Sequence, residues 1–104
     1  MADERPVDPA AVNAAVVAEL RAELGVRRVK APELAERTGI PAYALRRLFR
    51  EERPPVFGEV LAIAAALELD ISDVTERALD RARAEGRGIE DRRKEALRVA
   101  DTFL

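Results

Sequence analysis

Apolar side chains recur every three or four residues through most of the chain, and this spacing predicts helices. The first such stretch has apolar residues at a spacing of four, at Val12, Val16, Leu20 and Leu24. Asp8 and Pro9 suit the start of a helix, because Asp caps free amides and Pro tolerates the first helical position. Gly25 suits its end, since glycine enters the left-handed conformation cheaply. We therefore expect an amphipathic helix over residues 9–24.

The same reading predicts five more helices and no strand. They are expected over residues 31–38, 41–50, 56–67, 71–85 and 89–104. Gly39-Ile40-Pro41 separates the first two, and Asp70 is the expected cap of the helix over 71–85. The helix over 56–67 is expected to turn these residues inward: Phe57, Val60, Leu61, Ala64 and Leu67. The fold class is therefore all-α, with one domain over residues 1–85 and an amphipathic C-terminal helix within 86–104.

Composition excludes several kinds of chemistry. The 104 residues include no Cys, no His and no Trp. Disulfides, thiol nucleophiles, Cys/His zinc sites and imidazole bases are therefore excluded. The carboxylates are spread over helix surfaces, so we expect no enzyme, no catalytic residues, no metal site and no cofactor. The chain also has no apolar run long enough for a membrane span and no secretory signal, which favours a cytoplasmic protein.

Charge is distributed unevenly along the chain. Residues 27–53 carry 8 basic and 4 acidic side chains, whereas residues 54–85 carry 3 basic and 7 acidic ones. A basic block of net charge +4 within a chain of net charge −2 indicates an anionic partner that meets one face. The alternative interpretation is a solvated, arginine-rich helix face.

Residues 29–75 resemble the lambda-repressor-like, Cro/Xre-type helix-turn-helix domain. The resemblance begins with Val29-Lys30-Ala31-Pro32-Glu33-Leu34-Ala35-Glu36-Arg37-Thr38-Gly39-Ile40 and continues through Leu45, Leu48-Phe49 and Pro54-Pro55. It ends with Leu61-Ala62-Ile63-Ala64-Ala65-Ala66-Leu67 and Leu69-Asp70-Ile71-Ser72-Asp73-Val74. The connector at 25–30 is a few residues longer than is usual in the family. The resemblance implies a five-helix domain whose helix-turn-helix spans about residues 31–50, and a double-stranded DNA partner.

In this family the second helix of the pair enters the major groove, which is about 12 Å wide. By position, the resemblance implies that Ala42, Tyr43, Arg46 and Arg47 read bases, and that Arg46 is the candidate for bidentate bonding to guanine. It implies phosphate contacts for Arg28, Lys30, Arg50 and Arg53, with help from the amides that begin the preceding helix. The alternatives are a Tyr43 that is half-buried with its hydroxyl in water, a solvated face at Arg46 and Arg47, and flexible loop charges at Arg27 and Arg28.

Four positions depart from the family pattern. Ala31 stands where the family often has Gln, Pro41 and Ala42 replace polar residues, and Glu51 stands where Gly is common. Base reading is therefore expected to rest on few side chains. Glu51 and Glu52 are expected to weaken the attraction of phosphate to their neighbours.

The C-terminal segment has an apolar stripe that includes Ile89, Leu97, Ala100, Phe103 and Leu104. This stripe predicts a symmetric dimer interface or a partner-binding surface; the alternative is packing onto its own domain. The expected function is a sequence-specific transcriptional repressor of phage or mobile-element type, which binds operator DNA as a dimer. Two alternatives remain: the antitoxin of a toxin–antitoxin pair, which binds a protein partner through this segment, and a helix-turn-helix used for protein contact alone.

Overall fold

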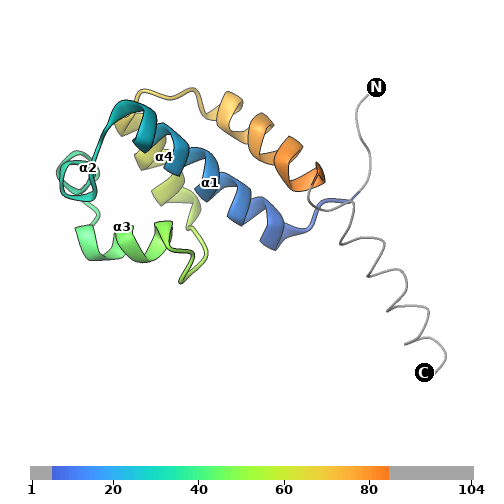
Figure 1. Ribbon diagram of the computed structural model, residues 1–104, viewed down its shortest axis with the longest axis horizontal. Coiled ribbons are helices and arrows are strands. Elements are labelled where there is room, and N and C mark those ends of the chain that lie inside the picture. Colours follow the sequence, from blue (N-terminus) through green and yellow to red (C-terminus); the bar gives the residue numbers. More distant parts are fainter. Residues whose placement is uncertain (1–5, 85–104) are drawn as a thin grey trace, which may run out of the picture.

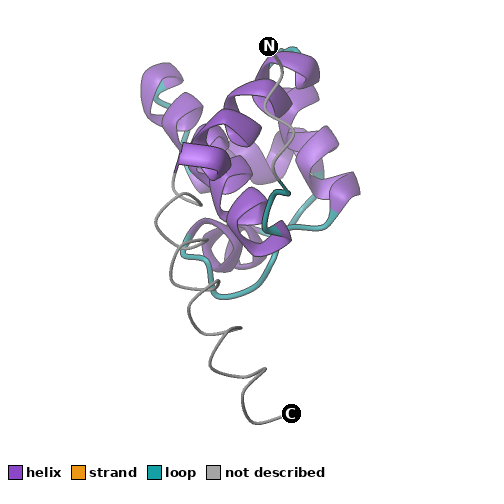
Figure 2. Cartoon of the chain, turned by 90° about the vertical axis from the view of Figure 1, so that its right-hand side faces the viewer, coloured by secondary structure: helices purple, strands orange, loops and turns teal. Residues whose placement is uncertain are grey.

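A computed structural model describes residues 6–84, and all regular structure in that range is helical (Figures 1 and 2). The helices are α1 (Pro9–Arg27), α2 (Ala31–Thr38), α3 (Ala42–Phe49) and α4 (Phe57–Ala66). A fifth helical stretch, which we call segment 71–84, follows α4. The predicted all-α, five-helix fold is confirmed. The predicted C-terminal helix lies outside the described residues.

One apolar core holds all five helices together. Its fully buried side chains come from every helix and are Leu20, Leu34, Leu45, Leu48, Ile63, Leu67 and Val74. Burying a side chain of this size contributes roughly 1.5–3 kcal/mol. The short helices α2 and α3, eight residues each, would be marginal in isolation, so this shared core keeps them folded.

The turn between α2 and α3 depends on glycine. Gly39 has φ 78°, in the left-handed region, and its amide donates to the carbonyl of Ala35 at 2.8 Å. The Thr38 hydroxyl donates to the Leu34 carbonyl at 2.8 Å and accepts from the Ile40 amide at 3.2 Å. These bonds satisfy the end of α2 and fix the direction in which α3 leaves.

Segment 71–84 runs antiparallel to α1 (Figure 1). Small residues allow the two helices to approach closely, since Ala15 of α1 packs with Ala78 and Ala82. As predicted, Asp70 caps the segment: its carboxylate accepts from the Ser72 amide at 2.8 Å. At the start of α1, the Asp8 carboxylate accepts from the Ala10 amide at 3.3 Å, which confirms that predicted cap as well.

Two of the sequence-based expectations are wrong. Helix α1 does not end at Gly25 but continues to Arg27, and Arg28 takes the left-handed conformation with φ 54°. A glycine in a helix interior costs only about 1 kcal/mol relative to alanine, so α1 can continue through Gly25. This extension accounts for the connector that looked long in the sequence.

The second error concerns α4, because two of the residues that were expected to face the core are exposed. Val60, Ala64 and Leu67 are buried as expected, but Phe57 is 73% exposed and Leu61 is 38% exposed. Every position of α4 except Glu59 is apolar or glycine, so hydrophobic periodicity could not separate the exposed residues 57 and 61 from the residues that face the core.

Candidate nucleic-acid interface

Helix α3 presents a polar stripe to solvent. Tyr43, Arg46, Arg47 and Arg50 are spaced i, i+3, i+4 and i+7, which places them along one side of the helix. All four are exposed, and Tyr43 is 67% exposed. The opposite side of α3 carries Leu45 and Leu48, both fully buried in the core. The core thus fixes the helix by one face and leaves the arginine face free to meet a ligand.

The amino-terminal ends of α2 and α3 carry no side-chain caps. The N-cap residues are Lys30 for α2 and Pro41 for α3, and neither makes a side-chain capping bond. The first amides of a helix point outward and carry partial positive charge, so an uncapped start is suited to bind an anion. The positive charge of Lys30 adds to this effect at the start of α2.

Most of the predicted DNA-contacting cations are free to bind phosphate. Within residues 6–84, the side chains of Arg28, Lys30, Arg46 and Arg50 form no ion pair or hydrogen bond, and all four residues are exposed. Arg47 is exposed but pairs with Glu52, with 3.4 Å between its Nε and the carboxylate Oε2. An exposed pair of this kind contributes about 0–1 kcal/mol, so a phosphate can displace the carboxylate.

Arg53 differs from these four cations. Its Nη1 and Nη2 donate to the two carboxylate oxygens of Glu59 at 2.8 and 2.7 Å. Glu59 also accepts from the Val56 amide at 3.1 Å and thereby caps the start of α4. The bond from Arg53 lowers the pKa of Glu59, and the same bond raises the pKa of Arg53. Arg53 therefore joins the turn after α3 to α4, and its guanidinium is less available than those of Arg28, Arg46 and Arg50.

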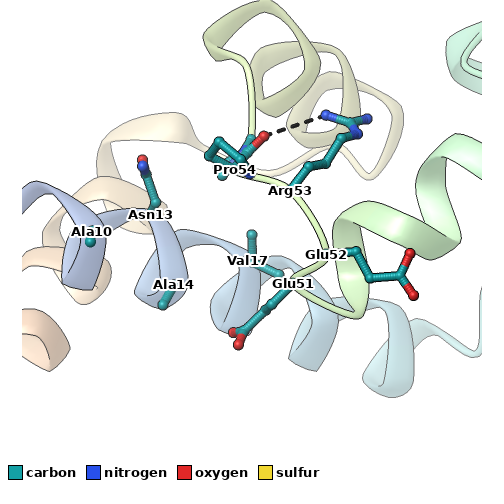
Figure 3. A pocket seen from close by; sticks show the side chains of 9 residues that line it. Ala10, Asn13, Ala14, Val17, Glu51, Glu52, Arg53 and Pro54 are labelled. Carbon is teal, nitrogen blue, oxygen red and sulfur yellow. Dashed lines mark hydrogen bonds between the residues drawn. The ribbon is translucent and has the colours of Figure 1, made fainter.

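A shallow cleft of about 260 Å³ lies between α1 and the turn at 51–55 (Figure 3). Ala10, Asn13, Ala14 and Val17 line it from α1, and Pro54 and Pro55 line it from the turn. The guanidinium of Arg53, which also lines the cleft, donates hydrogen bonds to Glu59 and is not available to a ligand there. The lining is mostly apolar and presents few convergent polar groups, so we assign no small-molecule ligand to it.

The sequence was also compared with known proteins. Residues 19–80 match the model of the Cro/C1-type HTH DNA-binding domain family. The chain belongs to this family. The comparisons with curated proteins and with solved structures gave no match.

Membership of the Cro/C1-type family assigns a role to α2 and α3. The matched span contains α2, α3 and α4 complete, so α2 and α3 are the helix-turn-helix and α3 is the recognition helix. The protein is a DNA-binding transcription regulator. No helix among residues 6–84 is both long and apolar enough to cross a membrane.

The structure places the predicted site residues as follows. Five of them lie together on α3 or at its end: Ala42, Tyr43, Arg46, Arg47 and Arg50. Arg28 and Lys30 lie in the connector that precedes α2. Ile89, Leu97, Ala100, Phe103 and Leu104 lie outside the described residues. The individual contacts with bases and phosphates stay predictions.

Sequence reasoning missed two carboxylates that organise the structure. Glu19 is only 9% exposed and accepts from Arg77 at 3.2 Å and from Arg81 at 2.8 Å. The available signal was an acid at a core-facing position of α1, matched by two arginines four residues apart on segment 71–84. Glu59 gave no comparable signal, because its partner lies six residues earlier across a Pro-Pro turn.

Proposed function

We propose that the protein is a sequence-specific repressor of phage or mobile-element type, which binds operator DNA in the cytoplasm as a dimer. The observation that carries this proposal is the exposed stripe of α3, with Arg46 and Arg50 unpaired among the described residues. A repressor acts by occupying a site that polymerase needs, and this requires tight and selective binding but no further chemistry.

The proposed division of labour follows the positions on α3. Tyr43 and Arg46, in the first turn and a half, read base edges, and Ala42 gives apolar contact at the helix start. Arg46 bonds the O6 and N7 atoms of a guanine, a contact that discriminates by about 1–3 kcal/mol. Arg47 reads the adjacent position once phosphate or base displaces Glu52.

Phosphate contacts set the register of the helix in the groove. Arg50 lies at the end of α3, and Lys30 and Arg28 lie at the start of α2. The two groups lie at opposite ends of the helix-turn-helix, so they can hold the DNA backbone at both sides of the groove. Arg53 contributes to DNA binding mainly by fixing α4 through its hydrogen bonds to Glu59, and less by direct contact with phosphate.

A dimer is proposed because one recognition helix contacts too few base pairs for useful specificity. Relatives of this architecture use two half-sites about 34–36 Å apart, one turn of DNA. Residues 89–104 are proposed to contribute to the contact between the two copies.

Selection of bound duplexes from a random pool tests the proposal. The full chain is incubated with the pool at about 0.1 M salt, and bound sequences are recovered over several rounds. We expect a consensus of two inverted half-sites, each containing a guanine that Arg46→Ala no longer selects. Recovery of no enriched sequence, or of an unchanged consensus with Arg46→Ala, contradicts the proposal.

A further inference from the structure

Helix α4 is apolar on its solvent side as well as on its core side. Its ten residues include a single charged side chain, Glu59. Phe57, Gly58, Leu61 and Ala65 are all exposed, and we call these four residues the outer face of α4. Val56, 60% exposed, extends this face at its amino-terminal end. A helix that faces water is normally polar on that side, so an apolar outer face indicates a surface that another molecule covers.

The neighbouring helices show that this is a property of α4 and not of the whole surface. Exposed positions of α2 include Glu33, Glu36 and Arg37, and those of α3 include Arg46 and Arg47. Exposed positions of segment 71–84 include acidic side chains. Among these elements, α4 is the one that offers solvent a stripe without charge.

The charge closest in sequence to the outer face is already neutralised. Glu59 forms two hydrogen bonds with Arg53, so this pair has no net charge. Two copies of the protein can therefore bring their α4 helices together without burying an unpaired charge and without repulsion between like charges at this point.

The sizes of the side chains on the outer face specify how a second copy fits. Phe57, Leu61 and Ala65 follow one another at a spacing of four, so the stripe goes from large to medium to small. In an antiparallel pair about a two-fold axis at Leu61, each Phe57 lies opposite Ala65 of the partner subunit, where there is room for the ring. A parallel pair would set Phe57 against Phe57 and leave a gap between the two alanines, which close packing disfavours.

The same antiparallel register also brings opposite charges together. Glu68 follows α4, is exposed, and forms no ion pair among residues 6–84. In this register Glu68 lies opposite residue 54 of the second copy, next to the amino terminus of its α4. A carboxylate is favourable there, because a helix amino terminus carries partial positive charge.

We propose that the outer face of α4 is a homodimer interface, in which two copies pack α4 against α4 in antiparallel orientation about Leu61. This inference rests on the proposed dimeric repressor and deepens it by naming a surface that joins the two copies in addition to residues 89–104. Two helices of about 15 Å bury less than the roughly 800 Å² per partner of a standard interface. The pair is therefore weak by itself, and binding of both half-sites on one DNA stabilises it.

Sedimentation equilibrium of the full chain without DNA, over a series of concentrations, tests the interface. We expect a reversible monomer–dimer equilibrium, and Phe57→Lys should raise the dimer dissociation constant about tenfold or more, because it buries a charge. Val26→Lys is the matched control, since Val26 is 77% exposed and lies in the last turn of α1. This control should leave the constant unchanged.

A charge-pair rescue tests the antiparallel register. Ala65→Glu alone should also weaken the dimer. Phe57→Lys combined with Ala65→Glu should restore it, because each new lysine then faces a new glutamate of the other copy. In a parallel pair the double variant would set like charges against each other and would stay dissociated. Circular dichroism of each variant verifies the helical fold, and both substituted positions are exposed, so the fold should be retained.

Three results would overturn the inference: a wild-type chain that stays monomeric up to about 1 mM, a Phe57→Lys dimer as tight as the wild type, or a double variant without rescue. These results are independent of DNA. A protein that forms this dimer but selects no operator would contradict the proposed function and leave the interface intact. A protein that selects an operator of two inverted half-sites, but whose dimer is as tight with Phe57→Lys as in the wild type, would contradict the interface and leave the proposed function intact.

Discussion

Arg46 and Arg50, on α3 and at its end, have surroundings opposite to those of Arg77 and Arg81 on segment 71–84. Arg77 and Arg81 both donate to Glu19 on α1, although their side chains are 47% and 43% exposed. Arg46 and Arg50 are also exposed, yet they have no partner within the described part of the chain. Pairing with a carboxylate of another helix, rather than exposure, therefore separates Arg77 and Arg81, which hold two helices together, from Arg46 and Arg50, which remain available to DNA. Every substitution below is chosen to test this difference.

The largest effect on binding is expected at Arg46. Replacing Arg46 by Ala removes the proposed bonds to a guanine and should cost about 1–3 kcal/mol on the selected operator. Thermal unfolding should be unchanged, because no described contact is lost. Fluorescence anisotropy on the operator and on a duplex with the guanine replaced measures the effect. If both duplexes lose affinity equally, Arg46 binds phosphate and does not read the base.

The largest effect on stability is expected at Glu19. Replacing Glu19 by Ala leaves Arg81 without its carboxylate, leaves Arg77 with only the longer pair to Glu23 at 3.9 Å, and opens space beside α1. The free energy of unfolding should fall by about 1–3 kcal/mol, measured by urea titration. Arg81→Ala should cost less, because Arg77 still pairs with Glu19. At temperatures where the Glu19→Ala protein is folded, its affinity for the operator should equal that of the wild type.

A smaller, pH-dependent effect is expected at Glu59. Its pKa is lowered in the folded protein by the bond from Arg53, so its contribution is fully present above the ordinary carboxylate pKa near 4.3. This stability is lost as the pH falls through the lowered pKa. Glu59→Gln should therefore destabilise the protein by about 1–2 kcal/mol at pH 7 and by much less at about pH 3. Glu33→Gln, in the exposed pair with Arg37, is the control and should change stability by less than about 1 kcal/mol.

The smallest effect is expected at Glu52, which pairs with Arg47 beside the recognition helix. Glu52→Gln releases Arg47 and removes a negative charge close to the DNA. Operator affinity should rise by less than about fivefold at low salt, and the gain should disappear at about 0.5 M salt. A gain that persists at high salt would show that Glu52 acts by a contact other than its charge.

Much of this fold could be predicted from the sequence, because its signals are local. The caps at Asp8 and Asp70, the glycine turn at residue 39 and the buried Leu45 and Leu48 each follow from neighbours within a few residues. The family resemblance, carried by the same stretches, was confirmed over residues 19–80. Likewise, Glu51 stands where Gly is common in the family, and its φ of 58° shows that the backbone there is left-handed.

The parts that could not be predicted depend on contacts between distant residues or on uniform composition. The pairing of Glu19 with Arg77 and Arg81 spans about sixty positions, and no local pattern selects those partners. In α4 the apolar residues surround the helix, so periodicity cannot separate the core face from the outer face. For the same reason the exposure of Phe57 and Leu61 became visible only in the structure.

The salt dependence of operator binding most directly tests the central claim that the unpaired Arg46 and Arg50 meet DNA, whereas Arg77 and Arg81, which are paired between helices, do not. Affinity is measured by anisotropy from about 50 to 300 mM salt for the wild type, Arg50→Ala and Arg81→Ala. Each phosphate contact contributes about −0.9 to the log–log slope. Arg50→Ala should lower affinity on every sequence and flatten the slope by roughly 1, whereas Arg81→Ala should reproduce the wild-type line. Equal slopes for all three proteins, or a flattening with Arg81→Ala alone, would contradict the account.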